Sequence, residues 1–302
     1  MLSVQSESTR AAAPFTRRMR GARLLLAFAA LFLVGGAALA LSDAPSSEGK
    51  CPVAEKLSAL LASWKVVHSE TKGTSEAEQA KLGTELATLA KECPVGSRLG
   101  ETFGFVKAVL QSTLGLEDAC SKNCPITVSG DKAACQVKEA RASLLTGLNE
   151  LASNAAGACG GCPAKDALVT SKDLAEKALL LKASWDKAPA EVAAMPAEKK
   201  KQTLAAFGAL AQRSKAVSLL PPTVEALGAG FEALDSLNGK LGEWVKAHPD
   251  AFKDVPEDAK KAMEGQMALL HATGEILQRA TSTIKCCNPE CCAVKTETAS
   301  TK

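Results

Sequence analysis

The sequence has no tyrosine, only 4% aromatic residues and only three histidines among its 302 residues. β-Sandwiches and barrels are rich in aromatic and β-branched residues, so this shortage argues against a sheet protein and favours a helical core of leucine and alanine. Apolar residues make up 46% of the chain and charged residues 23%, which is the balance of a folded domain rather than of a disordered chain.

Sequence motifs for several kinds of catalysis are also missing. The chain contains no phosphate-binding glycine-rich loop, no Gly-x-Ser-x-Gly turn and no His-Glu-x-x-His helix. No glutamate stands three residues before a histidine, so the Glu-x-x-His pairs of di-iron bundles are absent. No histidine follows Cys162, which excludes a Cys-x-x-Cys-His motif for covalent haem attachment. We therefore expect His68, His248 and His271 to be structural, and we expect no catalytic residue and no resident cofactor.

The positive charge is concentrated at the N-terminus. Residues 1–40 hold five of the 36 basic residues and one of the 33 acidic ones, so the rest of the chain has 31 basic against 32 acidic residues. A nucleic-acid binder needs a basic face that displaces counterions from phosphates. We therefore expect no nucleic-acid partner.

This N-terminus has the layout of an export signal. The five arginines precede the apolar run 24–41, and the small residues of Ala38-Leu39-Ala40 occupy the −3 and −1 positions of a cleavage site. We predict that residues 1–40 are a signal peptide, that 42–50 are a linker and that the mature protein is periplasmic or secreted. The alternative is an uncleaved anchor that contacts the membrane only through residues 24–41, because about 18 apolar residues are just enough to cross a bilayer.

Along the rest of the chain, apolar residues recur at three- and four-residue steps, which predicts amphipathic helices. Ser75 and Glu78 form a capping-box pattern at the start of one helix, and Pro221-Pro222 predicts the start of another. Trp64, Trp185 and Trp244 each lie near the end of an apolar stripe, so we expect them to anchor the core.

A shift of 121 residues brings two parts of the sequence into register. Ala62-Ser63-Trp64 falls on Ala183-Ser184-Trp185, and the apolar positions of three successive predicted helices coincide without a gap. The match predicts an internal duplication, because packing constrains core positions while surface positions drift. We therefore expect an all-α fold of two tandem antiparallel bundles of about four helices each, at 51–163 and 164–285. A single elongated array of helical hairpins is the alternative.

Eleven cysteines in an exported protein predict disulfide bonds. Cys51 precedes the first predicted helix and Cys93 follows the second, so an antiparallel hairpin would make them neighbours and a bridge would staple it. Cys120, Cys124 and Cys135 cluster before the fourth predicted helix, where we expect at least one bridge without assigning its pairing.

Two further groups of cysteines are Cys159-Gly-Gly-Cys162 and, in a tail at 286–302 that we expect to be disordered, Cys286, Cys287, Cys291 and Cys292. Structural bridging at helix ends is the main interpretation. Such thiolates can instead bind zinc or copper (Zn²⁺ or Cu⁺) or act as a redox couple. The odd cysteine count leaves one sulfur over, and the tail is the expected place for a disulfide to another molecule.

Together these patterns indicate a non-catalytic structural or interaction protein of the cell envelope or extracellular space, with a protein partner in the envelope. The alternative is thiol-based metal binding or redox exchange through the Cys-Gly-Gly-Cys and tail clusters.

Overall fold

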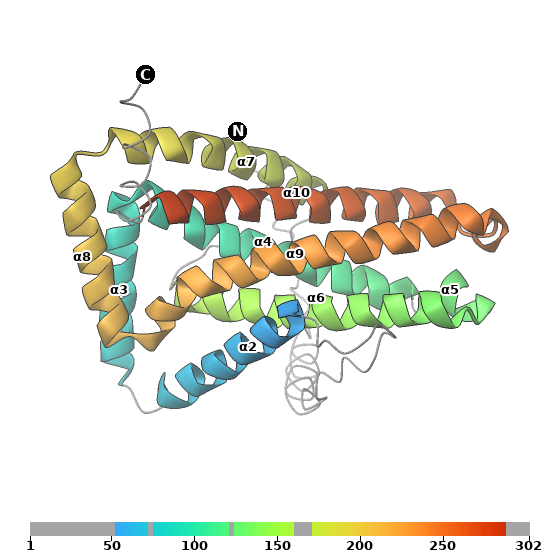
Figure 1. Cartoon of the computed structure of the whole chain (residues 1–302), viewed down its shortest axis with the longest axis horizontal. Coiled ribbons are helices and arrows are strands. Elements are labelled where there is room, and N and C mark those ends of the chain that lie inside the picture. Colours follow the sequence, from blue (N-terminus) through green and yellow to red (C-terminus); the bar gives the residue numbers. More distant parts are fainter. Residues whose placement is uncertain (1–51, 72–74, 121–123, 160–170, 288–302) are drawn as a thin grey trace, which may run out of the picture. The chain divides into compact units, whose positions relative to one another are not determined.

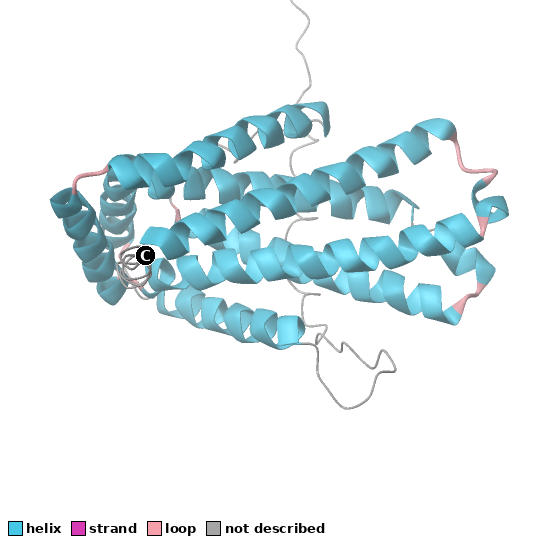
Figure 2. Ribbon diagram, turned by 45° about the horizontal axis from the view of Figure 1, so that its top comes forward, coloured by secondary structure: helices cyan, strands magenta, loops and turns pink. Residues whose placement is uncertain are grey.

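The computed structural model describes residues 52–71, 75–120, 124–159 and 171–287. The chain divides into the units Met1–Ser42 and Asp43–Lys302, and every described residue belongs to the second unit. The described residues form helices and no strand, which confirms the all-α prediction (Figure 2). The predicted signal peptide and most of the predicted tail lie outside these residues. Within the described ranges, no helix has both the length and the apolar character needed to span a bilayer.

In chain order the helices are α2 (Pro52–Thr71), α3 (Glu76–Glu92), α4 (Pro94–Cys120), α5 (Pro125–Ser129), α6 (Lys132–Ala158), α7 (Ser171–Ala194), α8 (Ala197–Arg213), α9 (Lys215–Ala247), the 3-10 helix η3 (Pro249–Phe252) and α10 (Glu257–Cys287). Helices α4, α6, α9 and α10 run alongside one another (Figure 1). Helices α2 and α7 lie along their outer sides, and α3 and α8 stand across one end (Figures 1 and 2).

Side-chain caps explain where two of these helices begin. The Ser75 hydroxyl accepts a hydrogen bond from the Glu78 N–H at 3.3 Å, and the Ser75 N–H donates to the Glu78 carboxylate at 3.4 Å. The capping box predicted for α3 is thereby confirmed. Asp131 caps α6 in a similar way, because its Oδ1 accepts from the Ala134 N–H at 3.1 Å.

The prediction that Pro221 and Pro222 open a helix is wrong. Helix α9 begins at Lys215, and both prolines lie inside its 33 residues. Proline has the φ angle of a helix but no N–H to donate, so each one removes a backbone hydrogen bond. The buried neighbours Leu220 and Val224 offset that loss, because they keep this stretch of α9 packed in the core.

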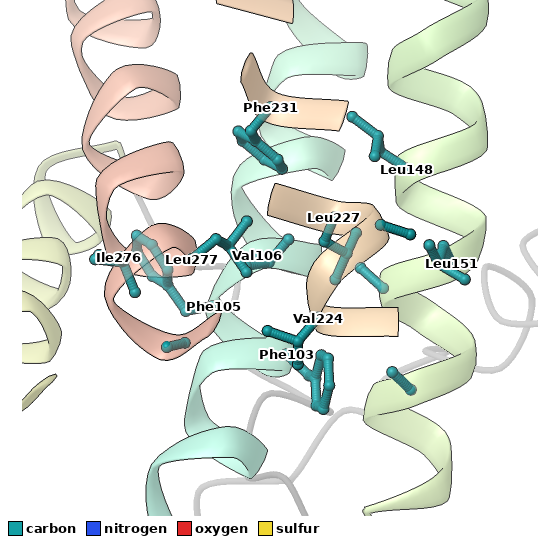
Figure 3. Packing of buried hydrophobic residues seen from close by; sticks show 14 of the residues in the cluster. Phe103, Phe105, Val106, Leu148, Leu151, Val224, Leu227, Phe231, Ile276 and Leu277 are labelled. Atoms are coloured by element: carbon teal, nitrogen blue, oxygen red, sulfur yellow. The ribbon is translucent and has the colours of Figure 1, made fainter. Parts of the chain in front are cut away.

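One hydrophobic core runs through the described helices. Its centre contains buried residues of four helices: Phe103, Phe105 and Val106 of α4, Leu148 and Leu151 of α6, Val224, Leu227 and Phe231 of α9, and Ile276 and Leu277 of α10 (Figure 3). Burying each of these side chains contributes about 1.5–3 kcal/mol. The apolar positions that the shift of 121 residues aligns in α4 and α9 therefore lie in the same core.

The first helix of each sequence half packs on the other half. Helix α2 contacts α9 as well as α6, and α7 contacts α4 as well as α10. Trp64 Nε1 on α2 donates to Thr223 Oγ1 on α9 at 3.1 Å, and Trp185 Nε1 on α7 donates to Thr102 Oγ1 on α4 at 2.9 Å. All four residues are at most 1% exposed. The helices of 51–163 and 164–285 thus share one core, and the boundary between the two predicted units stays a prediction.

Two glycines set how closely neighbouring helices approach. A Cβ on Gly230 of α9 would lie 2.3 Å from Leu148 Cδ2 on α6, and a Cβ on Gly147 of α6 would lie 2.8 Å from Leu57 Cδ2 on α2. Both distances are well inside carbon–carbon contact. Helix α6 can lie this close to α9 and to α2 because these two positions carry no side chain.

Candidate functional site

The structure places some of the predicted cysteines and leaves others undescribed. Cys51, Cys162, Cys291 and Cys292 lie outside the described residues, and Cys120, Cys286 and Cys287 are described only as helical backbone. Cys93 separates α3 from α4 and Cys159 caps the C-terminal end of α6, both half-buried against the core. The zinc, copper and redox predictions for the Cys-Gly-Gly-Cys and tail clusters therefore stay predictions.

The hairpin argument for a Cys51–Cys93 bridge has no support in the helix packing. Helix α2 packs on α6 and α9, whereas α3 packs on α4 and α8, so these two helices do not form the antiparallel pair that would bring the cysteines together. Cys93 is a free thiol in the structure. The bridge itself stays a prediction.

Two cysteines come together on the α5 hairpin, which we define as residues 124–138. Cys124 is the N-cap of α5, and Gly130 at its other end has a φ of 69°, a left-handed conformation that lets the chain turn back into α6. Cys135, in the first turns of α6, lies with its Sγ 3.6 Å from the carbonyl oxygen of Ile126. Cys124 and Cys135 are half-buried free thiols, so the bridge expected among Cys120, Cys124 and Cys135 stays a prediction.

The surroundings of Cys124 make its thiol more acidic than usual. Burial raises its pKa, but hydrogen bonds from the backbone of Thr127 and Ile126, together with the charge and hydrogen bond of Lys138, outweigh burial and hold the pKa below its usual value. Lys138 Nζ also donates to Thr127 Oγ1 at 2.9 Å, which fixes the ammonium group beside α5. Because the thiolate is the reactive form of cysteine, this environment favours nucleophilic chemistry at Cys124.

Asp131 links the α5 hairpin to the end of α9. Besides capping α6, it accepts a hydrogen bond from Trp244 Nε1 at 2.8 Å, and these bonds hold its pKa below the usual value, the backbone bond from Ala134 most strongly. The Trp244 ring stacks on His248 with 4.5 Å between centroids and meets Phe252 edge-on at 6.1 Å. Trp64 and Trp185 are core anchors as predicted, whereas the half-buried Trp244 ties the hairpin to η3.

The histidines are exposed. His68 lies in the last turn of α2, where a basic group complements the helix dipole, and His248 lies at the end of α9. His271 is 3.5 Å from an oxygen of Asp235 and 4.0 Å from one of Glu275. Among the side chains that the structure describes, no group of three or more His, Cys, Asp and Glu is placed to hold a metal ion.

Arg98 of α4 fastens α7 to the core. It is 9% exposed, and its Nε donates to the backbone oxygen and to Oγ of Ser184, each at 2.9 Å. Its Nη2 forms an ion pair with Glu191 at 2.8 Å. A buried guanidinium needs such partners because leaving it unpaired would be costly.

A second guanidinium, Arg141 of α6, joins the two sequence halves. It forms an ion pair with Glu117 of α4 and donates to Asn238 Oδ1 of α9 at 2.5 Å. Burial lowers its pKa to about 10, so it stays charged at neutral pH. Glu117 and Asn238 are themselves 121 residues apart, so Arg141 connects two positions that the predicted duplication would make equivalent.

One signal in the sequence was missed. Thr102 and Thr223 obey the same shift of 121 residues as the tryptophans that bind them, so the two pairs could have been found together. The acidity of Cys124 has no comparable signal, because it depends on how the α5 hairpin folds.

Comparisons of the chain with protein-family models, with curated proteins and with solved structures give no match.

Proposed function

We propose that the chain is an exported, non-catalytic helical protein that serves as a structural or interaction module of the cell envelope or extracellular space, with an envelope protein as partner. The reciprocal pair of buried Trp–Thr hydrogen bonds carries this proposal, because it uses polar groups of the core to fasten the helices together. Arg98 fastens α7 to α4, and Gln266 of α10 likewise donates to Thr113 Oγ1 of α4 at 2.6 Å. This use of polar groups suits a rigid scaffold.

The two halves of this scaffold are proposed to be products of a duplication. In the proposed arrangement, the first helix of each half packs against the other half. The Trp–Thr pairs support this arrangement. In the fourth helices the shift is 125 residues, and it relates buried positions of α6 to buried positions of α10: Leu145, Leu148, Leu151, Ala152 and Ala155 correspond to Leu270, Thr273, Ile276, Leu277 and Ala280. Four extra residues in the connection before α10 account for the change, since surface connections tolerate insertions.

Export is tested by N-terminal sequencing of the protein recovered from cell fractions. The proposal expects a mature chain that begins at Leu41 in the exported fraction. Ala40→Phe places a large residue at the −1 position and should block cleavage, whereas the control Leu39→Phe, at the −2 position, should be processed normally. Cytosolic protein that retains Met1 would contradict the proposal.

The interaction role is tested by chemical crosslinking in intact cells that express the full chain, followed by mass spectrometry of the crosslinked peptides. The proposal expects crosslinks from exposed lysines of the described helices to one recurring envelope protein. A chain that crosslinks only to itself would contradict an interaction role. Disulfide staples among the cysteines are part of the same proposal and are read from non-reducing peptide maps of the same samples.

A further inference from the structure

The α5 hairpin holds more reactive groups than a structural element requires. Two thiols, Cys124 and Cys135, and the ammonium group of Lys138 all lie along the same five-residue helix. Cys124 is half-buried rather than enclosed, and Val128, one turn further along α5, is 78% exposed.

We propose that Cys124 and Cys135 form a thiol–disulfide exchange site whose substrate is a low-molecular-weight disulfide. Cys124 is the attacking thiol and Cys135 is the resolving thiol. Exchange at this site is an activity beyond the non-catalytic role proposed above, and at these two cysteines it replaces the structural bridge expected among Cys120, Cys124 and Cys135.

The roles follow from the contacts of the two sulfurs. Lys138 contributes both a hydrogen bond and a positive charge at Cys124, and both favour the thiolate that must attack. Cys135 Sγ contacts the carbonyl oxygen of Ile126, which is only two residues beyond Cys124 in the chain. The two cysteines therefore lie on the same short hairpin, and joining their sulfurs requires a local opening of α5, whose buried Ile126 lies outside the central core.

The exchange balances as two substitutions at sulfur. The Cys124 thiolate attacks one sulfur of the small disulfide, the S–S bond of that molecule breaks, and one small thiolate leaves with its electron pair. Cys135 then gives its proton to solvent and attacks Cys124 Sγ, which forms the Cys124–Cys135 disulfide and releases the second small thiolate. The two protein thiols are oxidised by two electrons, and the small disulfide is reduced to two thiols.

The test uses the reduced full-length protein and glutathione disulfide as the probe, with samples quenched by acid and mapped by mass spectrometry. We expect glutathione to appear first on the peptide of Cys124 and then to disappear as a Cys124–Cys135 disulfide forms. Cys93 is the internal control, because it is also half-buried and a free thiol. Equal modification rates at Cys124 and Cys93, or a stable product that joins Cys124 to any other cysteine, would overturn the proposal.

Three variants separate the two steps. Cys135→Ser should trap the mixed disulfide on Cys124, and Cys124→Ser should abolish formation of the intramolecular bridge. Lys138→Met removes the charge, and modification of Cys124 should slow about threefold, since the loss of thiolate is partly offset by the greater nucleophilicity of a less acidic thiol. Far-ultraviolet circular dichroism checks that each variant is folded. Release of the mixed disulfide in Cys135→Ser at the wild-type rate would show that Cys135 is not the resolving thiol.

Discussion

Helices α2 and α7 occupy corresponding places in the two sequence halves, but different polar contacts hold them. Each buries a tryptophan that donates to a threonine of the other half. Helix α7 also accepts hydrogen bonds from Arg98. The residue 121 positions after Arg98 is Leu219, which cannot donate such bonds to α2. The α2 helix has instead two surface ion pairs with α9, Lys56 with Glu225 at 3.5 Å and Glu70 with Lys215 at 3.0 Å, in which the side chains are about half exposed.

Under the proposed duplication, this difference indicates which contacts a repeat retains. The Trp–Thr pairs lie in the shared core, where a change in one half would disturb both, and they match. The contacts of Arg98 with α7 and of Lys56 with α9 lie nearer the surface, and they differ between the halves. We therefore expect α2 to open more readily than α7, and the following changes test this expectation.

The largest effect is expected from removing the buried tryptophans. Trp64→Ala and Trp185→Ala should each lower the free energy of unfolding by about 3–5 kcal/mol, because each leaves a cavity in the core and an unpaired threonine hydroxyl. Urea unfolding followed by circular dichroism measures the loss. Trp244→Ala is the control and should cost less, because Trp244 is only half-buried. A loss below about 1 kcal/mol for either core tryptophan would show that the shared core does not hold the helices.

Arg98→Leu gives the first half the residue that the second half has at this position. We expect the free energy of unfolding to fall by about 2 kcal/mol, because the charged hydrogen bonds to Ser184 and the ion pair with Glu191 are lost. Hydrogen exchange in α7 should rise to the level of α2. Unchanged exchange in α7 would mean that Arg98 is not what distinguishes the two helices.

Asp131→Asn tests the polar link between the α5 hairpin and Trp244. Because the pKa of Asp131 is lower in the folded protein than its usual value, the carboxylate stabilises the fold above the unfolded pKa, near 4, and this contribution is lost as the pH falls through the folded value. The melting temperature of the variant should therefore be lower than wild type at neutral pH, and the gap should close in strong acid. A gap that is constant with pH would exclude the ionised carboxylate as its cause.

Lys56→Ala should have the smallest effect, a change of at most about 0.5 kcal/mol in the free energy of unfolding, because solvent screens the exposed pair with Glu225. A double-mutant cycle with Glu225→Ala measures the pair alone. A coupling as large as the effect of Arg98→Leu would remove the proposed difference between α2 and α7.

The sequence alone was sufficient for features that depend on local spacing. The helical class, the capping box at Ser75 and the burial of Trp64 and Trp185 all follow from periodicity and short-range hydrogen bonding. Periodicity identifies the buried face of a helix but not its partner, so the sequence pointed to α3 as the neighbour of α2, whereas α9 and α6 are observed.

The candidate site was less accessible to prediction. Its sulfurs were identified as a cluster, but the lowered pKa of Cys124 depends on hydrogen bonds from the backbone of Thr127 and Ile126 and then on Lys138, which the turn at Gly130 brings beside α5. The sequence match between α6 and α10 was also hidden, because four extra residues in the connection before α10 change the offset from 121 to 125 residues. Neither feature has a local pattern that reasoning from one sequence could recognise.

The missing side chain at Gly230 has a consequence for replacing one half by a copy of the other. The corresponding position in the first half is Val109, so the match between the halves fails where α9 meets Leu148. A chimaera that carried the first half twice would place valine against this leucine and force α6 and α9 apart. The two halves are therefore not interchangeable, and a chain that carried the first half twice could not reproduce this contact.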